Sequence, residues 1–435
     1  MKKSLLLRLV FVIVAIVGLS FSAIAQVTTS SMTGTIKDDK GALPGASVKA
    51  THTPTGTVYS VSTNGDGRFT IGGMRVGGPY TIEISFVGYK PSSLNDVSLK
   101  LGEPYVLNVV LVDNSSTLAE VKVVGQSTNS VLNSNRNGTS TVISKQQIQN
   151  LPTISRSVND LTRLTPQANG TSIGGGNYRS NNFTVDGANF NNQFGIGQNI
   201  PAGGSPISID ALEQISINVT PFDVRQTGFT GGSVTAVTRS GTNTFSGNAF
   251  YTMRGDDQQG NRIGETYRIP TLQKLDEKNY GFSLGGPIVK DKLFFFVNYE
   301  KKHTISPGTT KIAATPAQPF GSVSTVAKPT ESFLNEVSSY LNSQYGYQTG
   351  PYQGYSNTSD NEKMFARLDW NISKNHRFSV RYNQVESQSP SNLSTSTTGS
   401  GVTFGTNRIE GQQTLYHFSI QITIKQQIFI QELLN

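Results

Sequence analysis

Hydrophobic and polar residues alternate along much of this chain, in short runs that are interrupted by glycine, proline and asparagine. Alternation with a period of two places successive side chains on opposite faces of a strand. From Ser31 to Val112 it predicts six short strands, over Met32–Lys37, Ala46–Thr51, Val58–Thr63, Phe69–Ile71, Thr81–Val87 and Tyr105–Val112. Strands at this spacing, with turn sequences between them, indicate a small β-sandwich.

The alternation returns in longer runs after Thr244. It predicts six further strands, over Phe245–Arg254, Tyr280–Leu284, Leu293–Tyr299, Met364–Ile372, Phe378–Tyr382 and Tyr416–Ile424. The connections between them are alternately long (255–279 and 302–362) and short (286–292 and 373–376). Transmembrane barrels join such strands by short periplasmic turns and long outer loops. We therefore expect the first strands of a transmembrane β-barrel, with a soluble β-sandwich as the alternative.

The segment between these β-rich parts, residues 141–242, mixes helical and strand signals. Ile143–Pro152 predicts a capped helical turn, and Ser157–Pro166 predicts an amphipathic helix that ends before a proline. A glycine run, a hairpin turn and a stretch rich in glycine, serine and threonine follow, at Gly174–Gly176, Val185–Gly187 and Gly231–Thr242. The sequence therefore predicts a mixed α/β unit here.

The N-terminus carries the pattern of an export signal. Lys2, Lys3 and Arg8 precede an apolar run, which ends in Ala23-Ile24-Ala25 as a cleavage site. The formal charge of +8 falls to +5 once the three basic leader residues are removed. The remaining basic residues are spread along the chain, which argues against nucleic-acid binding. The chain has no cysteine, which excludes disulfides and cysteine-ligated metal sites.

Motifs for catalysis or cofactor binding are missing, so we expect no catalytic residue, no cofactor and no metal site. The four histidines, His52, His303, His376 and His417, have no metal-ligand spacing. Asn64–Gly67 has too few acidic residues for a calcium loop and is expected to be a hairpin turn. Gly174–Gly176 neither follows an expected strand nor opens an expected helix, so a flexible loop is expected instead of a phosphate loop.

Two further groups of side chains leave an alternative open. Asp186 and Asp210 are expected to be isolated turn carboxylates, and the alternative is a paired general acid and base. The five tyrosines within Tyr340–Tyr355 are expected in a long solvated loop, and the alternative is a ligand-stacking surface.

A short strip at Leu118–Gly125 combines three valines with Glu120 and Lys122. Valine favours strands, while the two charges keep the strip soluble. The strip lies between a polar break and a run rich in serine and asparagine, where it has little to pack against. Such a segment is suited to add as a strand to the edge of another protein's sheet. The alternative is that it forms the last or first strand of a domain.

Two parts of the sequence resemble known families. Gly34-x-Ile36, Leu43-Pro44-Gly45 and Phe86-x-Gly88-Tyr89, in this order, resemble the carboxypeptidase-regulatory-like domain, which implies a seven-stranded sandwich without a catalytic site. The helical elements, the Val-Asp-Gly hairpin and Gly231–Thr242 resemble the plug domain of TonB-dependent outer-membrane receptors. Within that family, the regulatory-like domain and the sequence around Asn181–Arg254 are most similar to the Oar-like branch of Bacteroidetes-type receptors.

The resemblance implies that Leu118–Gly125 is the TonB box, formed by Leu118, Ala119, Glu120, Val121, Lys122, Val123, Val124 and Gly125. It implies TonB, outer-membrane lipid and an unknown substrate as partners. The expected fold is mainly β: a seven-stranded sandwich, a mixed α/β plug and about six strands of an incomplete transmembrane barrel. The expected parts are a signal peptide (1–25), the sandwich (26–113), the box and a linker (114–140), the plug (141–242) and the partial barrel (243–435).

The implied function is substrate uptake across the outer membrane with energy from the inner membrane, with the sandwich in the periplasm. The alternatives are an Oar-like adhesion or structural protein without import, and a secreted carbohydrate-binding sandwich protein. A plugged barrel needs about 22 strands, and the residues after Ile424 contain neither a closing strand nor the terminal aromatic residue typical of outer-membrane barrels. We therefore expect a truncated product of a receptor about twice as long, by a frameshift near Gln421–Lys425. The alternative is that a second chain supplies further strands.

Overall fold

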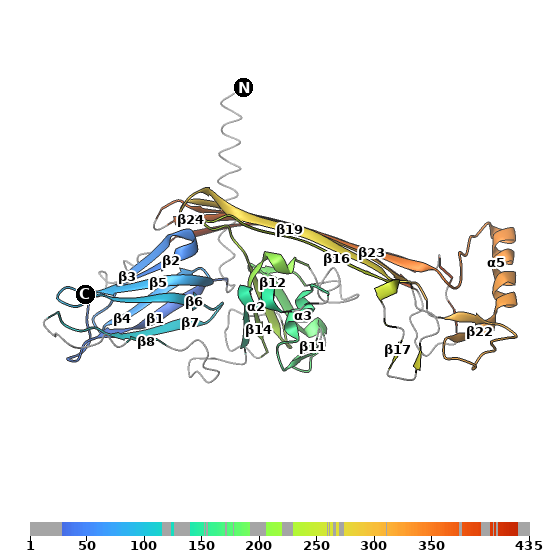
Figure 1. Cartoon of the computed structure of the whole chain (residues 1–435), viewed down its shortest axis with the longest axis horizontal. Helices are drawn as coiled ribbons and strands as arrows, with labels where there is room; N and C mark the ends of the chain where they lie inside the picture. Colours follow the sequence, from blue (N-terminus) through green and yellow to red (C-terminus); the bar gives the residue numbers. More distant parts are fainter. Residues whose placement is uncertain are drawn as a thin grey trace, which may run out of the picture.

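The computed structural model of the chain is mainly β and has three parts. Two of them, the N-terminal and the central part, lie below the third, one long curved sheet (Figure 1). It describes residues 28–114, 123–125 and 140–424, with gaps at 152, 154, 170–171, 177, 192–205, 220–228, 259, 261, 264–266, 269–273, 310, 374–375, 393–400, 403 and 406–407. The mainly β fold expected from the alternating pattern is confirmed. In the described residues, no helix has both the length and the apolar character needed to cross a membrane.

The N-terminal part is a sandwich of two four-stranded sheets. One sheet has the order β4-β1-β7-β8 and the other the order β3-β2-β5-β6. The strands are β1 (Ser30–Lys37), β2 (Ser47–His52), β3 (Thr57–Ser62), β4 (Arg68–Met74), β5 (Gly77–Ser85), β6 (Ser92–Leu99), β7 (Pro104–Val110) and β8 (Val123–Gly125). β1 is antiparallel to β4 and parallel to β7, so its backbone is paired along both edges.

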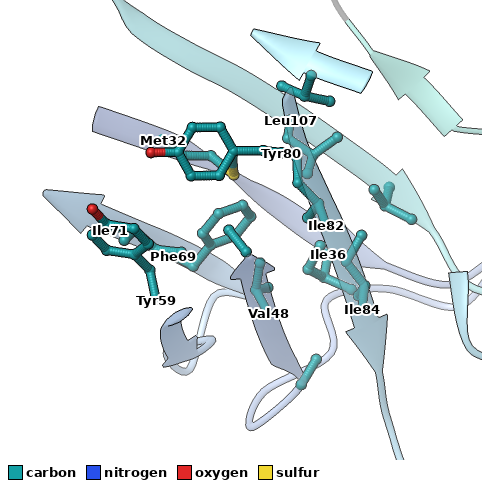
Figure 2. Packing of buried hydrophobic residues seen from close by; sticks show 14 of the residues in the cluster. Met32, Ile36, Val48, Tyr59, Phe69, Ile71, Tyr80, Ile82, Ile84 and Leu107 are labelled. Carbon is teal, nitrogen blue, oxygen red and sulfur yellow. The ribbon is translucent and has the colours of Figure 1, made fainter. Parts of the chain in front are cut away.

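The core of the sandwich follows directly from the period of two. In β2, Val48 and Ala50 are fully buried, while the alternate residues Ser47 and Lys49 are exposed. Side chains from both sheets, including Phe69 of β4 and Tyr80 of β5, point into the space between the sheets (Figure 2). This buried apolar surface provides the main driving force for folding.

Strand β6 is not among the strands that the sequence predicts. Its residues, Ser92–Leu99, are largely serine, asparagine and aspartate, which are uncommon in strands. Only Ser92, Val97 and Leu99 are buried, and the pairing with β5 is irregular. The edge position of β6 explains both features, because an edge strand has one side without a partner strand.

The central part contains a five-stranded sheet of order β13-β12-β15-β14-β9. Its strands are β9 (Ser140–Ser144), β12 (Asn182–Val185), β13 (Ala188–Asn189), β14 (Leu212–Asn218) and β15 (Ser233–Thr238). Two short helices, α2 (Lys145–Asn150) and α3 (Val158–Thr162), begin at the expected serines with capping boxes. A small hairpin, β10 (Ala168–Asn169) and β11 (Ser172–Ile173), and two 3-10 helices, η3 (Tyr178–Ser180) and η4 (Ile209–Ala211), complete it.

The C-terminal part is one six-stranded antiparallel sheet of order β16-β19-β20-β23-β24-β25. The strands are β16 (Ser246–Gly255), β19 (Asp276–Val289), β20 (Leu293–Pro307), β23 (Ser356–Asn371), β24 (His376–Asn392) and β25 (Arg408–Ile424). All six predicted strands are present, and most of them extend beyond the residue ranges that the alternation predicted. Within the described residues the sheet is open, with β16 and β25 at its edges.

The two faces of this sheet have the polarity of a membrane barrel. On β23 the apolar residues Met364, Leu368 and Trp370 are exposed, and the charged residues Arg367 and Asp369 are buried. A soluble protein would bury the apolar set and expose the charges. Barrels in outer membranes place apolar residues outward and polar residues inward, as here.

The long connections carry small elements of their own at the end of the sheet far from the sandwich (Figure 1). These are η5 (Asp256–Gln258), β17 (Arg262–Ile263), β18 (Tyr267–Arg268), β21 (Ile312–Ala314), β22 (Val326–Thr330) and α5 (Glu331–Tyr345). Helix α5 was not expected, because its tyrosines were assigned to a solvated loop. Thr330 caps its start, Gly346 ends it with a positive φ, and Tyr340 and Tyr345 remain exposed as expected.

Candidate functional site

The plug-like central part packs against the inward face of the six-stranded sheet. Phe296 of β20 and Phe365 of β23 belong to the same buried cluster as Ile215 and Val234 of the central sheet. Around this apolar contact the interface is polar and charged, and most of its ion pairs are buried. Buried charges require partners, so the geometry of these pairs defines how the two parts fit.

One ion cluster is built around the Asp186-Gly187 hairpin turn. The Asp186 carboxylate accepts hydrogen bonds from the Thr238 backbone N–H at 3.0 Å and from the Thr238 hydroxyl at 2.5 Å. Arg381 Nε of β24 lies 3.1 Å from Asp186 Oδ2. Arg367 of β23 donates to the Thr238 carbonyl at 2.7 Å and binds Asp369 through two nitrogens, at 2.8 and 2.9 Å. The cluster thus joins the central part to two strands of the sheet.

A second ion cluster lies further along the same face. Glu300 of β20 is 1% exposed and forms an ion pair of 3.1 Å with Lys363 of β23. The Ser208 hydroxyl, which also caps η4, donates to Glu300 at 2.6 Å. Arg156 pairs with Asp210 at 2.6 Å, and its guanidinium lies 3.8 Å above the Phe250 ring. Each charge therefore has a partner across or next to the interface.

Asp186 and Asp210 are therefore not isolated turn carboxylates, and that expectation is wrong. Each is paired with an arginine that is distant in the sequence, and the local pattern of the turn could not indicate this. The sequence pattern could have indicated that Arg367, Asp369 and Arg381 form buried ion pairs. They occupy inward positions in strands whose other face is apolar, where charges require a partner inside.

The sandwich is attached to both other parts. The Gln214 side chain of β14 accepts from the Leu101 N–H and donates to the Leu99 carbonyl, both at 2.9 Å, as a neighbouring strand would. Arg377, at the start of β24, donates to the Gly73 carbonyl and the Tyr59 hydroxyl and lies over the Tyr59 ring. These contacts place the sandwich at the short turns of the sheet (Figure 1).

The structure places only part of the predicted TonB box. Leu118–Lys122 lies outside the described residues. Val123–Gly125 forms β8, which pairs antiparallel with β7 through Val123 with Val109, Val124 with Asn108 and Gly125 with Leu107. The last three box residues thus extend a sheet of the sandwich, which corresponds to the alternative interpretation of this strip. The described residues hold no second sheet edge against them.

The other candidate sites are structural where the structure describes them. The Asn64 side chain accepts from the backbone of Asp66 and Arg68, as in a hydrogen-bonded hairpin turn. Gly174–Gly176 does follow a strand, the two-residue β11, contrary to expectation. It leads to a 3-10 helix of three residues, which offers no α-helical N-terminus for a phosphate. Among the described residues, no group of three or more histidines and carboxylates is placed to hold a metal ion.

Comparison with known proteins agrees with this arrangement. Residues 31–112 match the carboxypeptidase regulatory-like domain, and residues 237–432 match an outer membrane beta barrel domain. The TonB-dependent transporter Oar of Myxococcus xanthus is 29% identical over 314 residues, which are 67% of this chain and 28% of Oar. The chain is a homologue of this TonB-dependent transporter. It is therefore an outer-membrane protein, and it spans less than a third of its curated relative.

Two solved structures align with part of this chain. The outer membrane transporter YddB from Escherichia coli aligns with a TM-score of 0.43 at 13% identity, over 66% of this chain and 37% of YddB. A variant of the ferric enterobactin receptor from Pseudomonas aeruginosa aligns with a TM-score of 0.43 at 14% identity, over 66% of this chain and 38% of that receptor. The names of these relatives describe transporters and a receptor.

Proposed function

We propose that this outer-membrane protein acts as a TonB-dependent receptor that takes up a substrate with energy from the inner membrane. The observation that carries the proposal is that polar contacts hold the central part to the inward face of the sheet. They are the buried Asp186–Arg381 ion pair and the hydrogen bonds from Ser208 to Glu300 and from Arg367 to the Thr238 carbonyl. Polar contacts of this kind can exchange their partners for water when the plug moves. An interface made only of apolar side chains would expose its whole surface at a cost proportional to area.

In the proposed mechanism, Leu118–Gly125 pairs as a strand with the edge of TonB's periplasmic sheet. Backbone hydrogen bonds make such a joint tolerant of sequence and able to transmit a pull. The chain leads from the box to β9, the first strand of the plug. β9 is an edge strand of five residues, paired only with β14 in the described sheet. A pull therefore reaches the plug at a strand that can leave by breaking only its own pairs with β14, while the β12–β15 and β14–β15 pairs stay intact.

The sandwich lies in the periplasm in this proposal, because Asn371, at the end of β23 beside a short turn, donates to the Thr57 hydroxyl of the sandwich. Short turns face the periplasm in outer-membrane barrels. β8 joins the end of the box to the sandwich. The sandwich therefore holds the box close to the short-turn end, where TonB would approach.

The first prediction concerns the box. Val121→Pro removes a backbone donor and fixes φ, which a strand ladder does not tolerate. In the full chain carrying a photo-crosslinking residue at position 119, we expect crosslinking to TonB in cells to fall at least severalfold. Val131→Pro, in the serine- and asparagine-rich linker, is the matched control and should leave crosslinking unchanged.

Equal crosslinking of both proline variants would contradict the assignment of the box. The alternative role, adhesion or structure without import, predicts a different effect of Val121→Pro on the phenotype of the cell. In that case Val121→Pro would leave the phenotype of the protein intact.

A further inference from the structure

A cavity of about 310 Å³ lies where the sandwich, the plug and the six-stranded sheet meet. All three parts contribute to its walls. The lining includes six basic side chains: Arg75 of the sandwich, Lys145 and Arg239 of the plug, and Arg367, Arg377 and Arg381 of the sheet. Only two carboxylates, Glu213 and Asp369, line it with them. The formal charge of the lining is therefore strongly positive.

The carboxylate of Asp369 is already in use. It is held by Arg367 through two nitrogens, and Arg75 Nη2 lies 3.4 Å from it. Arg381 is 6% exposed, and its Nη2 donates to Gln421 at 3.0 Å. Its Nε is close to Asp186 but has no well-aligned hydrogen bond to any described residue. Arg381 thus has a buried donor that a further acceptor in the cavity could satisfy.

On the plug side, Glu213 is the only carboxylate in the described lining that faces Lys145 and Arg239. Arg239 Nη1 donates to the Asp210 backbone carbonyl at 3.1 Å, and its guanidinium lies 5.1 Å from the centre of the Phe296 ring. Burial lowers the pKa of both Arg239 and Lys145, although the field of Glu213 acts in the opposite direction. Arg377 binds a carbonyl and a tyrosine hydroxyl. These groups would all be stabilised by added negative charge.

We propose that this cavity binds a small soluble oxyanion that carries two or more negative charges, in phosphate or carboxylate groups. Guanidinium groups bind such oxyanions through paired, charge-assisted hydrogen bonds. Walls of low dielectric around a positive cleft concentrate the field and raise the local concentration of anions. The bound anion contacts side chains of all three parts, so it also strengthens the attachment of the sandwich to the plug and the sheet.

Calorimetric titration of the purified full chain in detergent with inorganic pyrophosphate tests the proposal. We expect saturable binding of one pyrophosphate per chain, above the heat produced by sodium chloride of equal ionic strength. Arg239→Gln should weaken binding roughly tenfold or more, since it removes one charge-assisted contact. Arg163→Gln, an exposed arginine on the same plug, is the matched control and should bind as the parent does. A parallel titration with citrate distinguishes phosphate from carboxylate preference.

Heat that does not saturate, or that equals the sodium chloride control, would overturn the proposal. So would equal affinity of the Arg239→Gln and Arg163→Gln variants. Circular dichroism verifies that each variant is folded. Lys145→Gln replaces Arg239→Gln if the latter does not fold, with the same expected loss. The result is independent of TonB, so it stands or falls separately from the transport proposal.

Discussion

At the scale of single residues, His52 shows how burial changes the chemistry of a side chain. It is 7% exposed, with Nδ1 2.7 Å from the Thr55 hydroxyl and its ring 4.9 Å from the Tyr80 ring. Burial, and then the nearby positive charges of Arg75 and Arg377, lower its pKa from 6.5 to about 3. The imidazole is therefore neutral in the folded sandwich over the whole range of ordinary pH.

This shift predicts a pH dependence of stability. The unfolded chain takes up a proton at His52 as the pH falls below about 6.5, while the folded sandwich takes it up only near pH 3. Stability contributed by the neutral form is therefore present above about 6.5 and is lost as the pH falls towards 3. Between pH 7.5 and 5.0 the loss should be about 2 kcal/mol.

Hydrogen exchange of sandwich peptides in the full chain, corrected for the intrinsic pH dependence of exchange, measures this change. Within residues 26–113 His52 is the only histidine, so the signal can be assigned to it. His52→Gln should flatten the pH dependence between 7.5 and 5.0. The same slope in this variant and in the parent would contradict the explanation.

At the scale of elements, β8 follows β7 along the chain and pairs with it at the edge of a sandwich sheet. β7 pairs with β1 along one edge, and without β8 its other edge would expose unpaired backbone groups. β8 covers that edge over three residues. The segment is short enough for the pairing to be reversible, which suits a segment that must also reach a partner.

A disulfide tests this pairing directly, because the chain has no cysteine of its own. Asn108 and Val124 lie directly opposite each other in the antiparallel ladder. Cα atoms in such pairs are about 4.5–5.5 Å apart, which suits a disulfide. We expect the Asn108→Cys/Val124→Cys chain to be oxidised on export to the periplasm, as measured by resistance to a thiol-reactive polymer on a gel.

The matched control combines Val124→Cys with Lys49→Cys. Lys49 is also exposed but belongs to β2, in the other sheet of the sandwich. This pair should remain reduced. Comparable oxidation of both pairs, or of neither, would contradict the β7–β8 register.

At the scale of the whole molecule, the buried hydrophobic clusters show which parts of the chain have a core of their own. The sandwich has its own buried cluster, and the plug shares a second cluster with the inward face of the sheet. Among the buried hydrophobic clusters of the described residues, only a small third one, of Val76, Leu101 and Val237, joins the sandwich to the plug. The sandwich should therefore fold without the rest, whereas the plug depends on the sheet.

Residues 26–113 expressed without the leader test this division. We expect a β-type circular dichroism spectrum and a single cooperative unfolding transition, since a domain of this size can bury enough apolar surface to fold alone. Ile84→Asn, which places a polar side chain in the core, is the control and should abolish the transition. A disordered spectrum for the unchanged fragment would show that the sandwich needs its contacts with the plug and the sheet.

The sequence alone determined most of the strands and the faces they present. Alternation is a local property of an extended backbone, so the pattern itself assigns Val48 and Ala50 of the sandwich, and Met364 to Trp370 of the sheet, to their faces. Capping serines and the Val-Asp-Gly turn act within a few residues, and they too could be recognised. The strand β6 and the helix α5 could not, because their polar or tyrosine-rich sequences lack a strong period and they form through contacts with neighbours.

Only the tertiary structure decided which distant residues meet. Asp186 and Arg381 are far apart in the chain, and their pairing depends on how the plug hairpin lies against β24. The same is true of β8 on β7, and of the cavity whose cations come from three parts of the chain. Long-range electrostatic partners leave no periodic trace in a sequence, because a charge needs only proximity in space and not a fixed separation along the chain.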